Sequence, residues 1–434
     1  MRTVLLLLLL ATILVSTTMT AAQTPLEFAK AWDESHISDK PASDIRHEDL
    51  KVYLGKLKEL GSKVEEVGRS YGGREIYQVE WGKGPFKVFL WSQMHGDEPT
   101  ATPALIDLFA FLETNREKIG WVGEMHNRLT IRAVPMLNPD GAEVFQRRNL
   151  QWIDINRDAR SLMTPEGQLL KRLVEEFFPD VGFNLHNQQE LTTAGRSFNQ
   201  ATISLLAVNG RPDNSTYPGF ERNKRICAEI VRALENFIPG HIAQYSDSYN
   251  SQAFGDNISS WGSPVILIET GGYHGKGEDF LIRLNFIAFL TALRTMVDGR
   301  MEGADPEAYN SLPPNSSGRI FNLIIRNAEI LIPGKAGKPY IADIGVNRER
   351  RRAQFIPPVY VREIGDLSNR KGLEEVDASG YYVVPKEGSL RNGTLGSFLF
   401  YKKSREVNWD SENLEKDFPP DGIYLFGQWI KPLE

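Results

Sequence analysis

The sequence predicts an α/β protein with three layers, in which a mixed, mostly parallel twisted sheet lies between two layers of helices, followed by a small all-β domain. Two observations carry this prediction. Between about residues 50 and 296, short apolar runs alternate with longer runs of helical periodicity, which is the pattern of a sheet covered by helices on both faces. After about residue 318, the apolar runs are short and separated by turn residues, which favours strands without helices.

The first of these regions is expected to contain at least four strands and four helices. The strands are predicted over 88–91, 129–136, 181–185 and 265–268, and the helices over 104–119, 165–178, 221–237 and 279–297. Further strands are predicted over 320–325, 358–361, 381–384 and 398–401. The predicted domains are 23–300 and 318–434, joined by a linker over 301–317 that is rich in Pro, Gly, Asn and Ser.

Residues 1–22 have the features of a secretory signal peptide. Arg2 precedes an apolar run from Val4 to Val15, and small residues follow near Ala22. We therefore expect a secreted or periplasmic protein. The alternative is a membrane anchor, which is less favoured because about twelve residues are too few to cross roughly 30 Å of hydrocarbon as a helix. No span is expected after cleavage of this segment.

The net charge of the chain gives no reason to expect binding to nucleic acid. It is -6 at pH 7, with 50 Lys and Arg against 56 Asp and Glu, and the sequence contains no long run of basic residues. An acidic protein without a basic patch lacks the electrostatic attraction on which nucleic-acid binding depends. We exclude that class of function.

Polar or titratable side chains follow each of the four strands predicted in the first region. His95 and Glu98 follow the first strand, Asn138 and Asp140 follow the second, His186 follows the third and Glu269 follows the fourth. Ligand sites in open α/β sheets form beyond the carboxyl ends of the strands. The sequence therefore predicts a site at this edge of the sheet.

His95 and Glu98 are candidate metal ligands. Residues three positions apart share one face when the chain turns helically. Hydrolytic zinc sites commonly take three ligands from His and carboxylate side chains and leave a fourth position open, so this pair needs a third ligand, for which His186 is the candidate. Taken alone, His95 and Glu98 could be a surface pair, and His186 a hydrogen-bonded structural residue. Together they predict a site for one Zn²⁺ ion.

Glu269 is the candidate general base. A carboxylate at the end of an apolar strand is expensive to bury without a partner, so it is usually paired or catalytic. Beside a metal-activated water, Glu269 could take the proton and pass it to the leaving amine. Arg147, Arg148 and Arg157, with Asn156, could bind a substrate carboxylate or an oxyanion, although arginines of this kind also occur in solvated ion pairs.

From about residue 50 to residue 296, the chain resembles the zinc metallocarboxypeptidases related to carboxypeptidase A. The resemblance rests on the order and spacing of seven motifs: Gly73-Arg74-Glu75-Ile76, His95-Gly-Asp-Glu98, Asn138-Pro-Asp-Gly141, Arg147-x-Asn149, Asp154-Ile-Asn-Arg157, His186 and Glu269-Thr-Gly. It implies that His95, Glu98 and His186 bind zinc, that Glu269 is the base, that Arg147 polarises the scissile carbonyl, and that Asn156 and Arg157 bind the C-terminal carboxylate. Arg148 is the alternative to Arg147.

The resemblance also implies a mobile tyrosine about twenty residues before the base. Tyr249 has a suitable separation from Glu269, but it precedes Gly255, whereas the family pattern places the tyrosine after the glycine. Tyr249 is therefore a candidate substrate-binding residue that departs from the pattern.

These residues predict a zinc-dependent metallocarboxypeptidase that hydrolyses the C-terminal peptide bond of peptides with a free carboxylate. One alternative is a zinc amidase or peptidase that acts on cell-wall peptides or N-acyl amino acids. An alternative of another class is a non-catalytic module that binds peptide or glycan. The presence of Glu269 and Arg157 counts against that module, because binding alone needs neither a base nor a carboxylate clamp.

Overall fold

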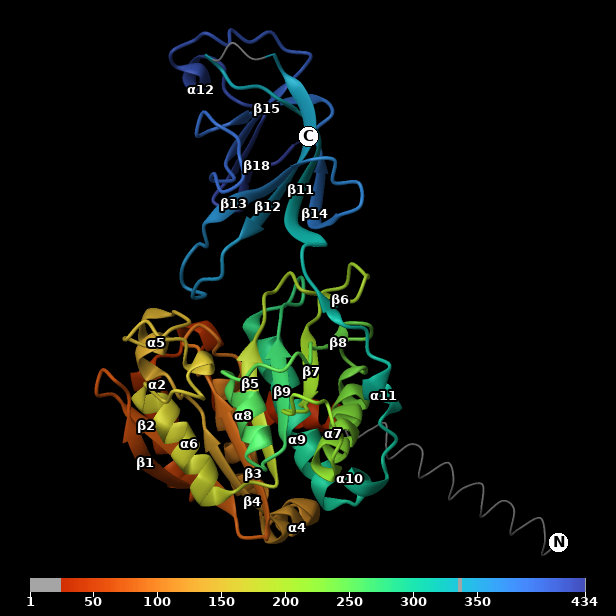
Figure 1. Ribbon diagram of the computed structural model, residues 1–434. Helices are drawn as coiled ribbons and strands as arrows, with labels where there is room; N and C mark the ends of the chain where they lie inside the picture. The colour runs from red at the N-terminus through yellow and green to blue at the C-terminus, as the bar shows by residue number, and fades with distance from the viewer. Residues whose placement is uncertain (1–24, 335–337, 434) are drawn as a thin grey trace, which may run out of the picture. The chain divides into compact units, whose positions relative to one another are not determined.

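The computed structural model describes residues 25–334 and 338–433, so the predicted signal segment lies outside the described residues. The chain divides into two compact units. The first contains the residues up to 190 together with 199–315, and the second contains 191–198 together with 316 onwards (Figure 1). Each unit is described by itself below.

The first unit is built on an eight-stranded sheet with the order β1-β2-β4-β3-β5-β9-β7-β8. Its strands are β1 (Lys63–Arg69), β2 (Glu75–Gly82), β3 (Phe86–Ser92), β4 (Leu129–Val134), β5 (Val181–Asn187), β7 (Ile203–Val208), β8 (Ile242–Gln244) and β9 (Val265–Thr270). The four central strands β4, β3, β5 and β9 are parallel, whereas β2 and β7 run antiparallel to their neighbours β4 and β9. The predicted mixed sheet is confirmed.

Helices cover both faces of this sheet. The longer ones are α2 (His47–Leu60), α3 (Ala101–Asn115), α4 (Gly120–Arg128), α6 (Pro165–Phe177), α7 (Pro218–Leu234) and α9 (Glu278–Val297); the shorter ones are α5 (Pro139–Val144), η2 (Ile155–Arg157), α8 (Phe254–Ser260), α10 (Arg300–Gly303) and α11 (Glu307–Asn310). Helices α2, α3, α4, α7 and α9 share one apolar cluster, and α6 and α8 share the other. This is the three-layer arrangement that the sequence predicts.

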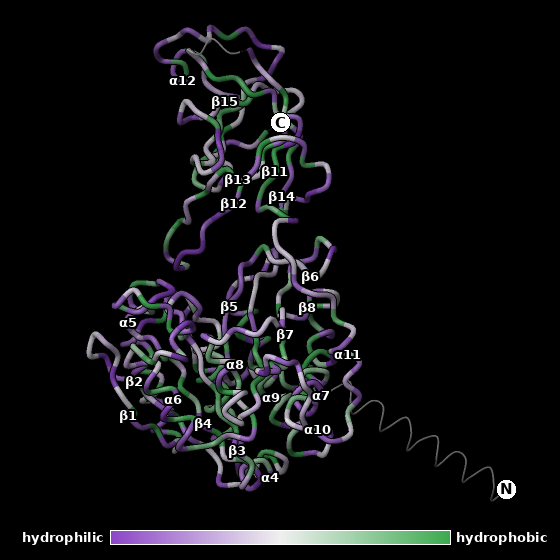
Figure 2. The backbone as a smooth tube through the Cα atoms, viewed as in Figure 1, coloured by the Kyte–Doolittle hydropathy of each residue, from purple (hydrophilic) through white to green (hydrophobic). Residues whose placement is uncertain are grey.

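Strand β3 shows why its residues form a central strand. Val88 and Leu90 belong to one apolar cluster, while Phe89 and Trp91 belong to the other. Successive side chains of a strand point to opposite faces, so a strand buried on both faces reads as an unbroken apolar run. In Figure 2 the hydrophobic segments of the first unit accordingly run through its interior.

Helix α9 is long and apolar enough to cross a membrane by length and composition, with a mean hydropathy of 1.6 in its most apolar window. In the structure, 78% of that window is buried, and its side chains join the cluster shared with α3 and α7. Such burial is typical of a core helix of a globular unit. The absence of a membrane span after the signal segment stays a prediction.

The segment predicted as a linker, 301–317, contains the helix α11 and the end of α10. Tyr309 of α11 is 1% exposed, and its hydroxyl accepts a hydrogen bond of 3.0 Å from the backbone amide of Ala207. The structure thus packs much of this segment into the first unit. Its Pro and Gly content indicates turns, but burial of Met301 and Tyr309 in the apolar cluster stabilises the segment against the core.

The second unit is a β structure, with strands in the order β13-β12-β11-β15-β16-β17-β18 and β14 beside β11. Its strands are β11 (Ile320–Ile330), β12 (Tyr340–Arg348), β13 (Val359–Gly365), β14 (Lys371–Asp377), β15 (Tyr381–Pro385), β16 (Phe398–Lys402), β17 (Gly422–Leu425) and β18 (Gln428–Lys431), with a short helix α12 (Leu414–Asp417). The short strands β6 (Thr193–Ala194) and β10 (Asn315–Ser316) form a separate two-stranded sheet. The predicted β-rich C-terminal region is confirmed.

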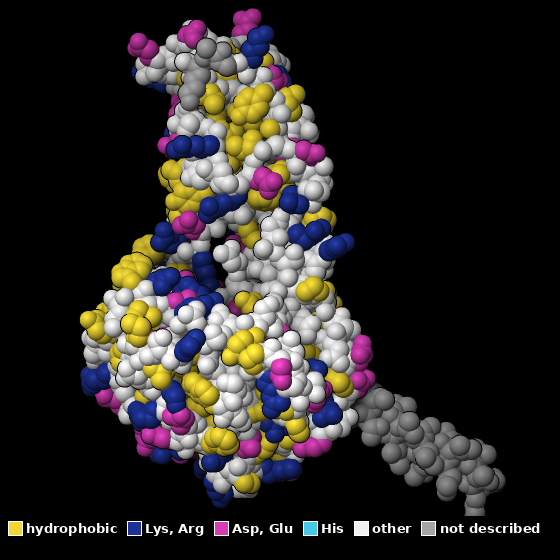
Figure 3. All heavy atoms as spheres, viewed as in Figure 1, with side chains coloured by type: hydrophobic (Ala, Val, Ile, Leu, Met, Phe, Trp, Pro, Cys, Tyr) yellow, Lys and Arg dark blue, Asp and Glu magenta, His cyan; other side chains and the backbone are white. Residues whose placement is uncertain are grey.

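Basic and acidic side chains are interspersed over the face of the first unit that Figure 3 shows. This distribution agrees with the mixed charges along the sequence. On this face, neighbouring charges of opposite sign keep any extended single-sign field small.

Asp107 on α3 ties the N-terminal segment to the core. Its carboxylate is 1% exposed and accepts hydrogen bonds from the Trp32 indole at 2.9 Å, the Ile37 amide at 2.9 Å, and the amide and hydroxyl of Ser38 at 2.9 and 2.7 Å. We expect Asp107→Ala to lower the free energy of unfolding by about 2–4 kcal/mol, because several buried donors lose their acceptor. Urea unfolding measures this. Asp107→Asn keeps one acceptor oxygen and should lose less; an unchanged midpoint in the alanine variant would contradict the expectation.

Candidate functional site

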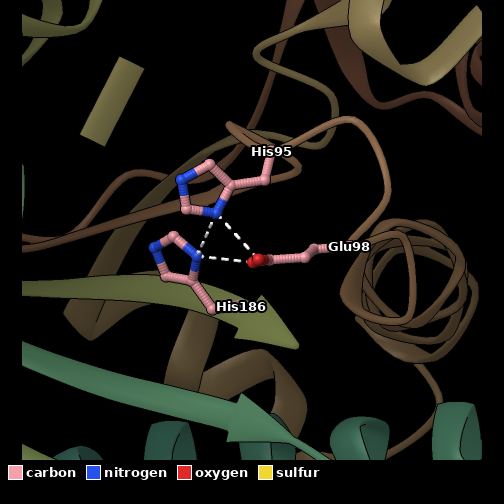
Figure 4. A group of neighbouring side chains, drawn as sticks. All are labelled: His95, Glu98 and His186. Atoms are coloured by element: carbon pink, nitrogen blue, oxygen red, sulfur yellow. Dashed lines mark hydrogen bonds and ion pairs between the residues drawn. The ribbon is translucent and has the colours of Figure 1, made fainter. Parts of the chain in front are cut away.

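His95, Glu98 and His186 converge on one point beyond the carboxyl end of the sheet (Figure 4). His95 and Glu98 lie in the turn between β3 and α3, where the Glu98 amide donates to the His95 carbonyl at 3.1 Å; His186 lies on β5. Nδ1 of His95 is 2.9 Å from Glu98 Oε1, and Nδ1 of His186 is 2.7 Å from Glu98 Oε2. The two Nδ1 atoms are 3.1 Å apart. The structure therefore brings together the three predicted ligands.

This donor set fits a divalent metal ion such as zinc. One ligand atom from each residue lies within 4.8 Å of the others, and all three residues are buried. Two imidazole nitrogens at hydrogen-bond distance direct lone pairs at each other unless a proton or a cation lies between them. Two His nitrogens and one carboxylate oxygen are a ligand set that catalytic zinc uses.

The electrostatics of the cluster depend on Glu98. Burial opposes its charge, but the neighbouring His95 and His186 hold the pKa of the Glu98 carboxyl well below its usual range. Burial likewise lowers the pKa of His95, yet Glu98 and Asp154 outweigh it and raise the value to about 9. Burial lowers the pKa of His186. The cluster is thus a buried carboxylate that attracts positive charge.

Asp154 orients His95 from the far side of its ring. Its Oδ1 is 3.0 Å from His95 Nε2 and accepts the Asn156 amide at 2.9 Å, while its Oδ2 accepts from Arg147 Nε at 2.9 Å. Glu98 is supported in the same way, because its Oε2 accepts the Asn187 amide at 3.1 Å. Sequence reasoning assigned Asp154 no role, although it begins the motif that ends at Arg157.

Removing the charge of Asp154 is expected to weaken metal binding. A carboxylate that holds the second nitrogen of a ligating imidazole fixes the ring and raises its basicity, so we expect Asp154→Asn to lower zinc affinity about 10–100-fold. Competition with a chromogenic chelator measures this affinity. The variant keeps the shape of the side chain, so its circular dichroism should match the parent; equal affinity in both proteins would show that Asp154 does not act on the ligand.

Arg147 is the predicted arginine that reaches the cluster. Its Nη1 is 3.0 Å from Glu98 Oε1 and 3.1 Å from His95 Nδ1. Arg148, in contrast, is exposed and donates to the Trp152 carbonyl at 2.9 Å. A cation beside the ligands can stabilise negative charge that develops on a substrate oxygen.

Glu269 lies one strand away from His186. The two residues are direct partners in the parallel pairing of β5 and β9, and Glu269 is 8% exposed. The two strands therefore carry a metal-ligand candidate and the base candidate at the same level of the sheet.

The remaining predicted residues lie on the segments beside the cluster. Asn156 accepts the Phe254 amide at 2.9 Å through its side-chain oxygen, which docks the start of α8. Arg157 is exposed and donates to the Asn156 carbonyl at 2.7 Å. Tyr249 is 38% exposed in the segment between β8 and α8. Their roles in substrate binding stay predictions.

Tyr245 is a residue that sequence reasoning missed. Burial raises the pKa of its hydroxyl, and the charges of Glu269 and Glu98 raise it further. This tyrosine therefore lies within the electrostatic field of the site. Its signal in the sequence is its place directly after the short strand β8.

Asn138 and Asp140 are not brought to the cluster. Asn138 donates to the Met94 carbonyl at 3.2 Å, and Asp140 accepts from Arg74 at 2.6 Å. A Cβ on Gly96 would lie 2.0 Å from the backbone of Gly141. The segment that contains Asn138 and Asp140 therefore packs against the turn that carries His95. Only glycine at position 96 allows the backbone of Gly141 to approach so closely.

Comparisons with known proteins find carboxypeptidases. Residues 53–200 match the model of the zinc carboxypeptidase family. Carboxypeptidase 2 of Trichophyton rubrum is 30% identical over 187 residues, which cover 40% of this chain and 33% of that protein. Carboxypeptidase D of Drosophila melanogaster is 31% identical over 148 residues, which cover 29% of this chain and 10% of that protein. The chain thus covers a third or less of the length of these relatives.

The solved structures that are similar to the chain include one from Pseudomonas aeruginosa and one of a bovine protein. A metallo-carboxypeptidase from Pseudomonas aeruginosa, in complex with (2-guanidinoethylmercapto)succinic acid, is 18% identical with a TM-score of 0.47, covering 58% of this chain and 69% of that one. Bovine thrombin-activatable fibrinolysis inhibitor, in complex with tick carboxypeptidase inhibitor, is 13% identical with a TM-score of 0.47, covering 60% and 98%.

Proposed function

Since this chain contains a domain of the zinc carboxypeptidase family, we propose that it is a secreted or periplasmic zinc-dependent metallocarboxypeptidase. Its reaction is the hydrolysis of the C-terminal peptide bond of peptides that end in a free carboxylate. The observation that carries the proposal is the convergence of His95, Glu98 and His186 at the carboxyl ends of the strands, with Glu269 on the neighbouring strand.

The residues of the cluster have separate roles in this reaction. His95, Glu98 and His186 hold the metal, and Asp154 fixes the ring of His95. A zinc ion in this site supplies Lewis acidity, which lowers the pKa of water and polarises a carbonyl oxygen. Arg147, beside Glu98, stabilises the negative charge on the oxygen of the scissile carbonyl.

Glu269 moves the proton. Its carboxylate takes a proton from the attacking water as the new carbon–oxygen bond forms, and gives it to the amine nitrogen as the carbon–nitrogen bond breaks. Arg157 and Asn156 bind the terminal carboxylate, for which an exposed guanidinium is the suitable partner. That contact restricts cleavage to the last residue.

The proposal is tested with pairs of peptides that differ only in a free or an amidated C-terminus. We expect release of the last residue from the free peptide alone, inhibition by a chelator, and recovery with zinc. Arg157→Ala should reduce this discrimination, whereas Arg160→Ala, a matched exposed arginine, should keep it. Equal cleavage of both peptides would favour the zinc amidase alternative, and metal-dependent binding without turnover would favour the binding module.

A further inference from the structure

Trp152 has a conformation and an exposure that its residue type does not favour. Its φ is 61°, in the left-handed region, and its side chain is 70% exposed. A bulky side chain in that region is strained, and such strain persists only where the surrounding structure imposes it; residues of this kind cluster at functional sites. A large aromatic ring also loses free energy by facing water. Neither property benefits the folded state.

The backbone at Trp152 is held by a buried network. The Trp152 amide donates to the Asn149 carbonyl at 3.0 Å, and the Ile153 amide donates to the Asn149 side-chain oxygen at 3.1 Å. Asn149 is fully buried and donates to Glu166 at 3.1 Å, which is also fully buried. The network fixes the backbone at Trp152, so the exposed ring is carried by a rigid turn.

The turn that carries Trp152 is attached to the metal cluster at both ends. Arg147, at one end, contacts Glu98, and Asp154, at the other, contacts His95. The two ends also bind each other, with 2.9 Å between Arg147 Nε and Asp154 Oδ2. Because a residue extends the chain by at most about 3.6 Å, the Cα of Trp152 lies within about 7 Å of that of Asp154. The backbone of Trp152 therefore lies beside the segments that support the cluster, and its ring is exposed there.

A second exposed aromatic ring shares the same support. The Tyr71 amide donates to Glu166 at 3.0 Å, and Tyr71 is 60% exposed. One buried carboxylate thus anchors the backbones of both Tyr71 and the turn of Trp152. Two aromatic side chains on one rigid support are suited to contact flat apolar groups.

We propose that Trp152, supported by Tyr71, binds the substrate residues on the N-terminal side of the cleaved bond and favours aromatic or other flat apolar side chains there. The inference rests on the proposed function. A carboxypeptidase substrate has one residue beyond the cleaved bond, so an exposed ring on the turn between Arg147 and Asp154 is placed to meet the residues before that bond. The ring is then a specificity determinant, which explains why strain and exposure are retained at this position.

The test compares two tetrapeptides that have Phe or Gly two residues before the cleaved bond. We expect the parent to prefer the Phe peptide, and Trp152→Gly to reduce the ratio of the two kcat/KM values about 3- to 10-fold, which is the range for one aromatic contact. Trp152→Phe should restore most of the preference. The melting temperature of Trp152→Gly should equal or exceed that of the parent, because glycine relieves the backbone strain.

The matched control is Phe178→Gly. Phe178 is 60% exposed and has a φ of 49°, but it precedes β5 and so lies at the opposite end of that strand from His186. It should leave the preference unchanged. An unchanged preference in Trp152→Gly would overturn the inference while the proposed function stands.

Calorimetry with Glu269→Gln, with and without Trp152→Gly, measures the binding of both peptides without turnover. Equal affinities for the two peptides in these proteins would also overturn the inference. Absence of both cleavage and binding would end both proposals.

Discussion

Replacing Glu269 by glutamine is expected to lower kcat by about 10²–10⁴-fold, the range supplied by a positioned general base. Glutamine has nearly the same shape but cannot accept a proton at neutral pH. Glu269 is the pairing partner of His186 on β9 and is not one of the three ligand candidates, so the variant should still bind one zinc per chain. The release of a C-terminal residue measures kcat, and elemental analysis measures the metal.

The control for this variant is Glu175→Gln. That carboxylate lies on the exposed surface of α6, with 57% of its side chain accessible, and should not affect kcat. Retention of full turnover by Glu269→Gln would remove the residue from the mechanism. Loss of the metal together with activity would instead identify Glu269 as part of the metal site.

Replacing His186 by alanine is expected to reduce zinc affinity by more than about 100-fold, beyond the effect of losing a supporting carboxylate. The His186 Nδ1 atom is 2.7 Å from Glu98 and 3.1 Å from His95 Nδ1, so its removal opens one side of the ligand set. Chelator competition measures the affinity. The melting temperature gives a second measure, since a ligand that binds only the folded state raises it by mass action.

His36→Ala is the control for His186→Ala, because His36 is exposed and its Nδ1 contacts the Trp32 carbonyl instead of the ligand set. Its zinc affinity and its melting response to zinc should match those of the parent. If His186→Ala binds zinc as tightly as the parent, His95 and Glu98 hold the metal with a different third ligand, and the proposed site is wrong.

In the first unit, the four central parallel strands β4, β3, β5 and β9 could be predicted from the sequence, whereas β1, β2, β7 and β8 were not predicted. Strand β5 is buried along its whole length, so its apolar run stands out. Strand β1 carries charged and partly exposed residues, and its sequence has no apolar periodicity that separates it from a loop. Strand β7, Ile203–Val208, is an unbroken apolar run like β5 and carried a usable signal.

The cluster of candidate ligands could be predicted, but the contacts that support it could not. His95 and Glu98 are neighbours in sequence, and His186 ends a strand whose direction is predictable. The contact between His95 and Asp154 spans 59 residues, and it depends on the path of a loop that no periodicity defines. For the same reason, the field of Glu269 and Glu98 at Tyr245 became visible only in the structure.

The pairing of His186 with Glu269 on two hydrogen-bonded strands has a consequence for how the sequence of this protein can change during evolution. Their backbones are separated by the distance between adjacent strands, about 4.8 Å, which no insertion in a surrounding loop alters. Under the proposed function, lengthening or replacing those loops would change which substrates bind, while the spacing between His186 and Glu269 would stay constant. The β-sheet thus keeps the spacing of these two residues independent of changes in the loops.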